Sequence, residues 1–144
     1  MREIDFRMWD STTKKYFHDP MNVFECLKQQ SFYDKKLGFL AYNHIDGGCV
    51  FEQYTGLKDK NRVKIFEGDI VRITNSESQI QKMEATGAVS ITPLGPMIEN
   101  IHWHRIDGYI NHQKTGTIYF INIVGTRIIE IIGNIHDNPE MVNP

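Results

Sequence analysis

Residues 54–71, which read YTGLKDKNRVKIFEGDIV, decide how this chain of 144 residues can fold. The stretch holds two glycine-centred turn signals, Thr55-Gly56 and Glu67-Gly68-Asp69, with a basic run between them. Glycine at such positions accepts the positive φ that tight turns require. The stretch therefore predicts a short basic hairpin that leads into a buried strand over residues 70–74.

Working outward, the beginning of the chain predicts a second hairpin. Residues 4–10 partly alternate apolar and polar side chains, which places Ile4, Phe6 and Met8 on one face of a strand, with Trp9 starting a turn. Residues 16–17 return as the second strand. Trp9, Phe6 and Tyr54 are interpreted as core aromatics, because each alternates with polar neighbours.

The rest of the chain predicts mostly short strands. Asp46-Gly47-Gly48 favours a hairpin between residues 39–45 and 49–54. Further strands are expected at residues 87–92, 101–110, 117–124 and 127–132, the last nearly all β-branched and typical of a strand buried on both faces. A short helix is expected at residues 22–30, and residues 75–86 are ambiguous. These elements predict one mainly β domain over residues 1–144 with minor α, a small barrel or sandwich of short antiparallel strands, with an SH3-like barrel as one alternative.

Composition limits the function. The formal net charge of −2 excludes a strongly basic protein that coats nucleic acid by bulk electrostatics, and two cysteines make no disulfide framework. Neither a signal peptide nor a membrane-spanning apolar run is recognisable. We therefore expect a soluble, cytoplasmic protein.

Three separated segments, taken together, resemble the YopX family. They are REIDFRMWD at residues 2–10, QYTGLKDKN with IFEGDIV at residues 53–61 and 65–71, and EIIGNIHDNPE at residues 130–140. The resemblance implies a mostly β protein of bacteriophages and prophages, inside the bacterial host cell, with no established activity and no cofactor to carry over. In the family, glycine usually follows Lys-Asp-Lys-Asn, whereas this chain has Arg62.

The basic hairpin is the main candidate for a binding site. Its cations, with flanking aromatics, would suit phosphate contacts and base stacking on single-stranded nucleic acid. Alternatively, the hairpin contacts a host protein, or it is merely a solvated hairpin whose lysines protect a sheet edge in a structural or oligomer-forming protein. The candidate residues are Lys58, Lys60, Arg62, Lys64 and Arg72 with Tyr54 and Phe66.

Catalytic and metal sites are weaker candidates. His102 and His104 would point to the same side of a strand, so both imidazoles could reach one ion in a metal-dependent hydrolase. The third ligand would come from His44, His112, Glu99 or Asp107. A polar strand face with Trp103 turned inward explains the same pattern. Four turn acids could suggest a two-metal nuclease, although turn hydrogen bonding explains them equally well: Asp10, Glu67, Asp69 and Asp137. We therefore expect no catalytic residues, no metal and no cofactor.

Two structural expectations complete the analysis. Gly56, Gly68 and Gly133 lie at turns between apolar runs, and Asp69 follows one of these glycines, so these positions are interpreted as structural. The strand at residues 127–132 is too apolar to be left in water, which predicts self-association into a homo-oligomer.

Overall fold

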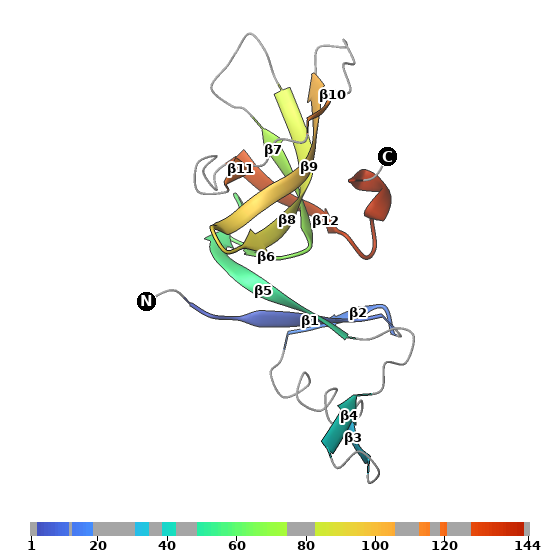
Figure 1. The fold of residues 1–144 in the computed structure, drawn as a ribbon. Helices are drawn as coiled ribbons and strands as arrows, with labels where there is room; N and C mark the ends of the chain where they lie inside the picture. The colour runs from blue at the N-terminus through green and yellow to red at the C-terminus, as the bar shows by residue number, and fades with distance from the viewer. Residues whose placement is uncertain are drawn as a thin grey trace. The chain divides into compact units, whose positions relative to one another are not determined.

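The computed structural model describes residues 3–11, 13–18, 31–34, 39–42, 49–74, 83–105, 113–115, 119–120 and 128–142. These residues form β-strands and short 3-10 turns, with no α-helix among them, which confirms the mainly β antiparallel fold (Figure 1). No helix in these parts is long and apolar enough to cross a membrane. The helix expected at residues 22–30 lies outside the described residues.

The chain divides into two compact units, one of residues Ile4–Gln53 and one of Tyr54–Pro144 with Met1–Glu3. The strand β5 (Cys49–Lys58) runs from the first unit into the second. The single domain expected over residues 1–144 stays a prediction.

The first unit is built around β1 (Phe6–Asp10), which pairs with β2 (Lys15–Phe17) and with the first half of β5. The β1–β2 hairpin confirms the expectation, with Met8 opposite Phe17. Two expectations for this strand are wrong, namely that Trp9 starts a turn and that Phe6 is a core aromatic. Trp9 lies within β1 and is buried, whereas Ile4 is 74% and Phe6 47% exposed. Pairing with β5 extends β1 through Trp9 and Asp10, so the strand does not turn where its local sequence suggests.

The expected hairpin between residues 39–45 and 49–54 is also wrong. β4 (Phe39–Tyr42) pairs with β3 (Ser31–Asp34), and β5 pairs with β1, where Trp9 lies opposite Val50. Pairing with a strand distant in sequence thus overrides the local turn signal, as is common in sheets. The Asp46-Gly47-Gly48 segment itself lies outside the described residues.

The second unit contains the larger sheet, in the order β10-β9-β8-β7-β12 with antiparallel neighbours, and β11 also pairs with β9. The second half of β5 pairs with β6. The bounds are β6 (Lys64–Phe66), β7 (Asp69–Thr74), β8 (Met83–Thr92), β9 (Gly95–Arg105), β10 (Gln113–Thr115), β11 (Tyr119–Phe120), β12 (Ile129–Asn134) and the 3-10 helix η2 (Pro139–Met141).

Strands β8 and β9 are longer than expected and form a curved hairpin (Figure 1). β9 begins at Gly95 rather than at residue 101. Its register with β8 shifts between the pairs Thr86–His102 and Ala88–Glu99, so β9 has one extra residue there. Asn100 lies in this bulge with a φ of 52°. Such a bulge bends a strand without ending it. The irregular stretch around Asn100 explains why sequence patterning detected only the second half.

The core of this unit lies between the inner faces of β6, β7, β8, β9 and β12. In β12 only Ile129 is fully buried, and residues 130–134 are half-buried. The expectation of a strand buried on both faces is therefore wrong: Ile129 and Ile131 pack against the core, whereas the side chain of Glu130 between them is 28% exposed. The buried cluster consists of Ile65, Val71, Ile73, Ala85, Val89, Ile98, Ile101 and Ile129.

Candidate binding loop between β5 and β6

The loop of residues 58–63, called here the β5–β6 loop, is set up by a bulge in β5. Tyr54 lies opposite Phe66, but the next matched pair is Lys58 with Lys64. Gly56 takes a φ of 84°, and the Thr55 hydroxyl donates to the Ile65 carbonyl at 2.7 Å. The Thr55-Gly56 signal thus forms a bulge inside a strand and not a turn, because the Thr55 hydroxyl supplies the cross-strand bond there.

Asp59 holds the loop together through its buried carboxylate. Its side chain is buried, and its Oδ1 accepts hydrogen bonds from the backbone N–H groups of Asn61 and Val63, at 2.8 and 2.9 Å. Its Oδ2 accepts from the Ile131 N–H on β12 at 3.3 Å. The neighbouring Lys60 N–H donates to the Ile129 carbonyl at 2.9 Å. The loop is therefore fixed both to itself and to β12.

Three of the five candidate cations are paired with carboxylates. Lys60 Nζ lies 2.8 Å from Glu130 Oε2, and Lys64 Nζ lies 2.7 Å from Glu3 Oε1. Arg72 lies 3.7 Å from Glu130, at the outer limit of an ion pair. The hydrogen bond from Lys60, with the positive charges of Lys60 and Arg72, lowers the pKa of Glu130. These cations are partly neutralised within the unit.

Lys58 and Arg62 differ from the other three. Both are exposed, and within the described parts of the chain neither has an ion-pair partner. Arg62 also has a φ of 65°, the left-handed region that non-glycine residues rarely adopt. Next to it, Val63 is 52% exposed. The outer surface of the loop is consequently cationic, with one apolar side chain.

The two flanking aromatics are buried. Tyr54 is 3% and Phe66 5% exposed, and their ring centroids lie 5.6 Å apart in a tilted arrangement. Lys64 Nζ lies 5.1 Å from the centre of the Tyr54 ring. Because both rings pack inside the unit, neither offers a face on which a base could stack.

His102 and His104 both lie on β9, and the side chain of His102 forms a structural contact. His102 is buried, and its Nε2 lies 3.2 Å from the Val142 carbonyl, so the ring contacts the C-terminal segment. The side chain of His104 is outside the described residues, as are His44, Asp107 and His112. Among the described residues, no three histidines, cysteines or acids are grouped closely enough to hold an ion.

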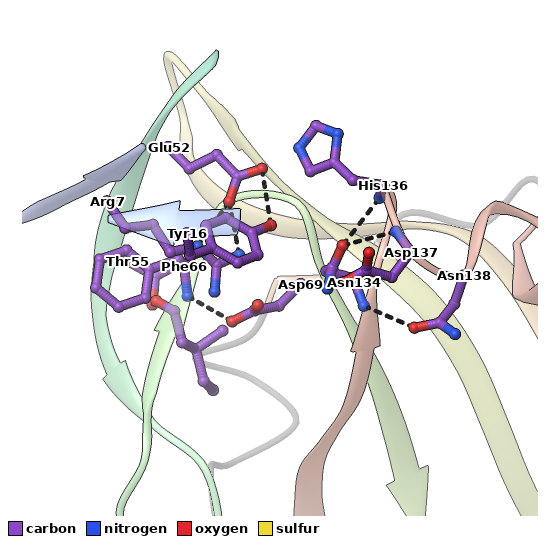
Figure 2. A network of polar contacts seen from close by, with 11 residues as sticks. Arg7, Tyr16, Glu52, Thr55, Phe66, Asp69, Asn134, His136, Asp137 and Asn138 are labelled. Carbon is purple, nitrogen blue, oxygen red and sulfur yellow. Dashed lines mark hydrogen bonds and ion pairs between the residues drawn. The ribbon is translucent and has the colours of Figure 1, made fainter. Parts of the chain in front are cut away.

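Three turn acids, Asp10, Asp69 and Asp137, bond to their own local turns, as Figure 2 shows for Asp69. Asp69 Oδ2 accepts from the Phe66 N–H at 2.8 Å. Asp10 Oδ2 accepts from the Thr13 hydroxyl at 2.7 Å, and Asp137 Oδ2 accepts from the Asn134 side-chain amide at 2.8 Å. Glu67 is half-buried in the β6–β7 turn. These contacts are those expected of structural turn residues.

Gly68 and Gly133 are constrained in different ways. Gly68 has a φ of 79°, donates its N–H to the Val89 carbonyl and accepts from the Ile135 N–H, each at 2.9 Å. The turn expected at Gly133 is wrong, because Gly133 lies inside β12, next to the register shift between Ile131 and Gly133. It is constrained by space instead, since an added Cβ would lie 2.5 Å from Asn138 Oδ1.

Sequence reasoning missed two polar centres. One is Asp59, although an acid two residues before Asn61 is a recognisable signal for a side-chain-capped turn. The other is a buried ion pair in the first unit, where Arg7 Nη2 lies 2.6 Å from Glu52 Oε2 (Figure 2). The Arg7 guanidinium also lies 4.2 Å from the centre of the Tyr16 ring. Only the strand pairing of β1 with β5 brings Arg7 and Glu52 together.

Comparisons with known proteins agree with this architecture. The family model described as YopX protein matches residues 5–143. The crystal structure of protein EF1440 from Enterococcus faecalis aligns with a TM-score of 0.50 and 22% sequence identity over 99% of both chains. At this identity the likeness concerns the fold alone. No curated protein matches the sequence.

Proposed function

This chain belongs to the YopX family, and we propose that it is a non-enzymatic phage or prophage accessory protein that binds a protein partner through the β5–β6 loop. The partner surface would be acidic, with an apolar spot for Val63. The observation that carries this proposal is the left-handed backbone of Arg62, an exposed residue for which the described chain provides no ion-pair partner.

A non-glycine residue in the left-handed region costs on the order of 1–2 kcal/mol. Strained residues of this kind are concentrated at functional sites, where the surrounding structure holds them in place. Here Asp59 supplies that hold, because its carboxylate and its carbonyl accept from the N–H groups of Asn61, Arg62 and Val63. The fold tolerates arginine at a position that favours glycine, which supports a role for the guanidinium outside folding.

The fixed loop favours binding because little backbone freedom is lost when a partner docks. Arginine suits the role, since its planar guanidinium bonds carboxylates in a bidentate fashion. A purely structural role accounts for Lys60, Lys64 and Arg72, because each is paired with a carboxylate. It does not explain Arg62, whose side chain is exposed.

A protein partner is favoured over single-stranded nucleic acid for two reasons. Both candidate stacking rings are buried, and three of the five cations already contact carboxylates. Binding of single strands draws on exposed aromatic faces and on unpaired cations along the backbone. The described loop leaves only Lys58 and Arg62 free for phosphate contacts.

Arg62→Gly should weaken partner binding without lowering the stability of the fold. Glycine adopts the observed φ without strain but adds flexibility to the unfolded chain, so the free energy of unfolding should stay equal or rise by up to about 1 kcal/mol. Partner affinity should fall by about tenfold or more, as for a central interface arginine. Urea unfolding measures the first effect. A lower stability would contradict the description of Arg62 as a strained residue.

Site-specific photo-crosslinking tests the binding itself. A photoreactive residue at position 63 should cross-link a discrete protein in cells that carry the phage or prophage, and adding Arg62→Gly should remove the product. The same residue at the exposed Leu94 of the β8–β9 turn is the matched control and should give no such product. Equal products at both positions, or salt-sensitive retention on single-stranded DNA that Arg62→Gly removes, would refute the protein-partner proposal.

A further inference from the structure

The outer edge of β12 is already occupied by the β5–β6 loop. β12 closes the described sheet next to β7, with Glu130 opposite Arg72. The Ile129 carbonyl and the Ile131 N–H point away from β7 and bond to Lys60 N–H and Asp59 Oδ2. These two groups flank Glu130, and a further strand would bond to the same positions.

Asp59 and Lys60 thereby imitate one residue of an added strand. The Lys60 N–H acts as its donor, and the Asp59 carboxylate takes the place of its carbonyl. Between these two bonds, Lys60 Nζ contacts Glu130 at 2.8 Å. Three consecutive residues of β12 are therefore held by two consecutive residues of the loop.

We infer that Asp59 and Lys60 close the β12 edge against strand addition, and that removing the Asp59 acceptor lets this edge pair with β12 of a second copy of the chain. Open edges rich in β-branched residues are the usual sites of such pairing, and β12 contains three isoleucines, with Ile128 preceding it. Pairing of identical edges around a two-fold axis is self-complementary, so a second copy fits without any other partner.

Closure of the β12 edge limits how the wild-type chain can self-associate. The homo-oligomer expected from the sequence stays a prediction, but the wild-type chain would not form it through the described edge of β12. Closure of this edge does not depend on the proposed protein partner, because the bonds involved lie on the inner side of the loop.

Asp59→Asn tests the inference with minimal change in shape. Asparagine has only one side-chain acceptor oxygen. If that oxygen keeps the bonds from Asn61 and Val63, the amide NH₂ group faces the Ile131 N–H, and the bond to Ile131 is lost. Analytical ultracentrifugation should give a weight-average mass that rises with concentration toward twice the wild-type value. Lys60→Ala is the matched control: it removes the ion pair to Glu130, keeps both backbone contacts, and should sediment like wild type.

The double variant Asp59→Asn/Ile131→Pro distinguishes edge pairing from misfolding. Proline removes the outward N–H of Ile131, and prolines are tolerated at edge positions where that group does not bond within the sheet. The double variant should return to wild-type sedimentation. Association that persists in the double variant, or wild-type sedimentation of a folded Asp59→Asn protein, would overturn the inference.

Hydrogen exchange on the wild-type protein provides a test that does not depend on variant folding. The amides of Lys60 and Ile131 should both be protected and should exchange more slowly than amides of an unstructured peptide. Exchange of the Ile131 amide at the rate of an unstructured peptide would show that the edge is open and would overturn the inference by itself.

Discussion

Glu52→Ala should lower the free energy of unfolding by about 3–5 kcal/mol, the usual cost of removing one member of a buried ion pair. The side chains of Arg7 and Glu52 are 9% and 2% exposed, and the Arg7 guanidinium, which also lies over the Tyr16 ring, would stay buried without the Glu52 carboxylate. Trp9 is buried 4.9 Å from the Tyr16 ring, so its fluorescence reports on this unit during urea unfolding.

The control replaces both members of the pair. Arg7→Met with Glu52→Leu removes both charges and fills similar volume, and exchanges of this kind are often neutral or stabilising. Most of the lost stability should therefore return. If the double variant is as unstable as Glu52→Ala, the loss comes from the shape of the site and not from a buried Arg7 charge that has lost Glu52.

Gly68→Val should have the next largest effect. Valine at a φ of 79° is a strong outlier, since a left-handed residue costs on the order of 1–2 kcal/mol and β-branching adds to this. The turn cannot relax easily, because the Gly68 N–H bonds to Val89 and its carbonyl accepts from Ile135. We expect a loss of more than about 2 kcal/mol, seen as a melting temperature lower by several degrees.

Gly68→Asn and Gly68→Ala complete this series. Asparagine tolerates the left-handed region better than other non-glycine residues, so stability should fall in the order glycine, asparagine, alanine, valine. If asparagine is no more stable than valine, the cost lies in the space around the turn and not in its backbone angle.

Local chemistry explains what the sequence predicted correctly. The Gly68-Asp69 turn, the following strand at residues 70–74 and the β1–β2 hairpin each depend on neighbours within a few positions, and the family signatures lie in the same segments. The basic hairpin was recognised as a candidate site in the same way, because its charges are visible in the sequence itself.

Contacts between distant segments explain what the sequence did not predict. Asp59 bonds to Ile131, 72 positions away, and Glu52 meets Arg7 only because β5 pairs with β1. The sequence shows which side chains are basic but not which of them are paired. Glu3 and Glu130, which pair with Lys64 and Lys60, lie far from them along the chain. A short local window cannot contain such partners.

The way in which Asp59 supports its loop also bears on how the protein can evolve. One buried carboxylate fixes the backbone of residues 61–63, and the side chains at positions 58, 62 and 63 point outward without shaping it. Mutations at positions 58 and 63, and exchanges at position 62 among residues that tolerate its left-handed φ, can therefore accumulate with little loss of stability, whereas a change at Asp59 affects the loop and β12 together. Under the proposed function, exchanges at the tip of the loop would change the partner that is bound while the scaffold stays the same.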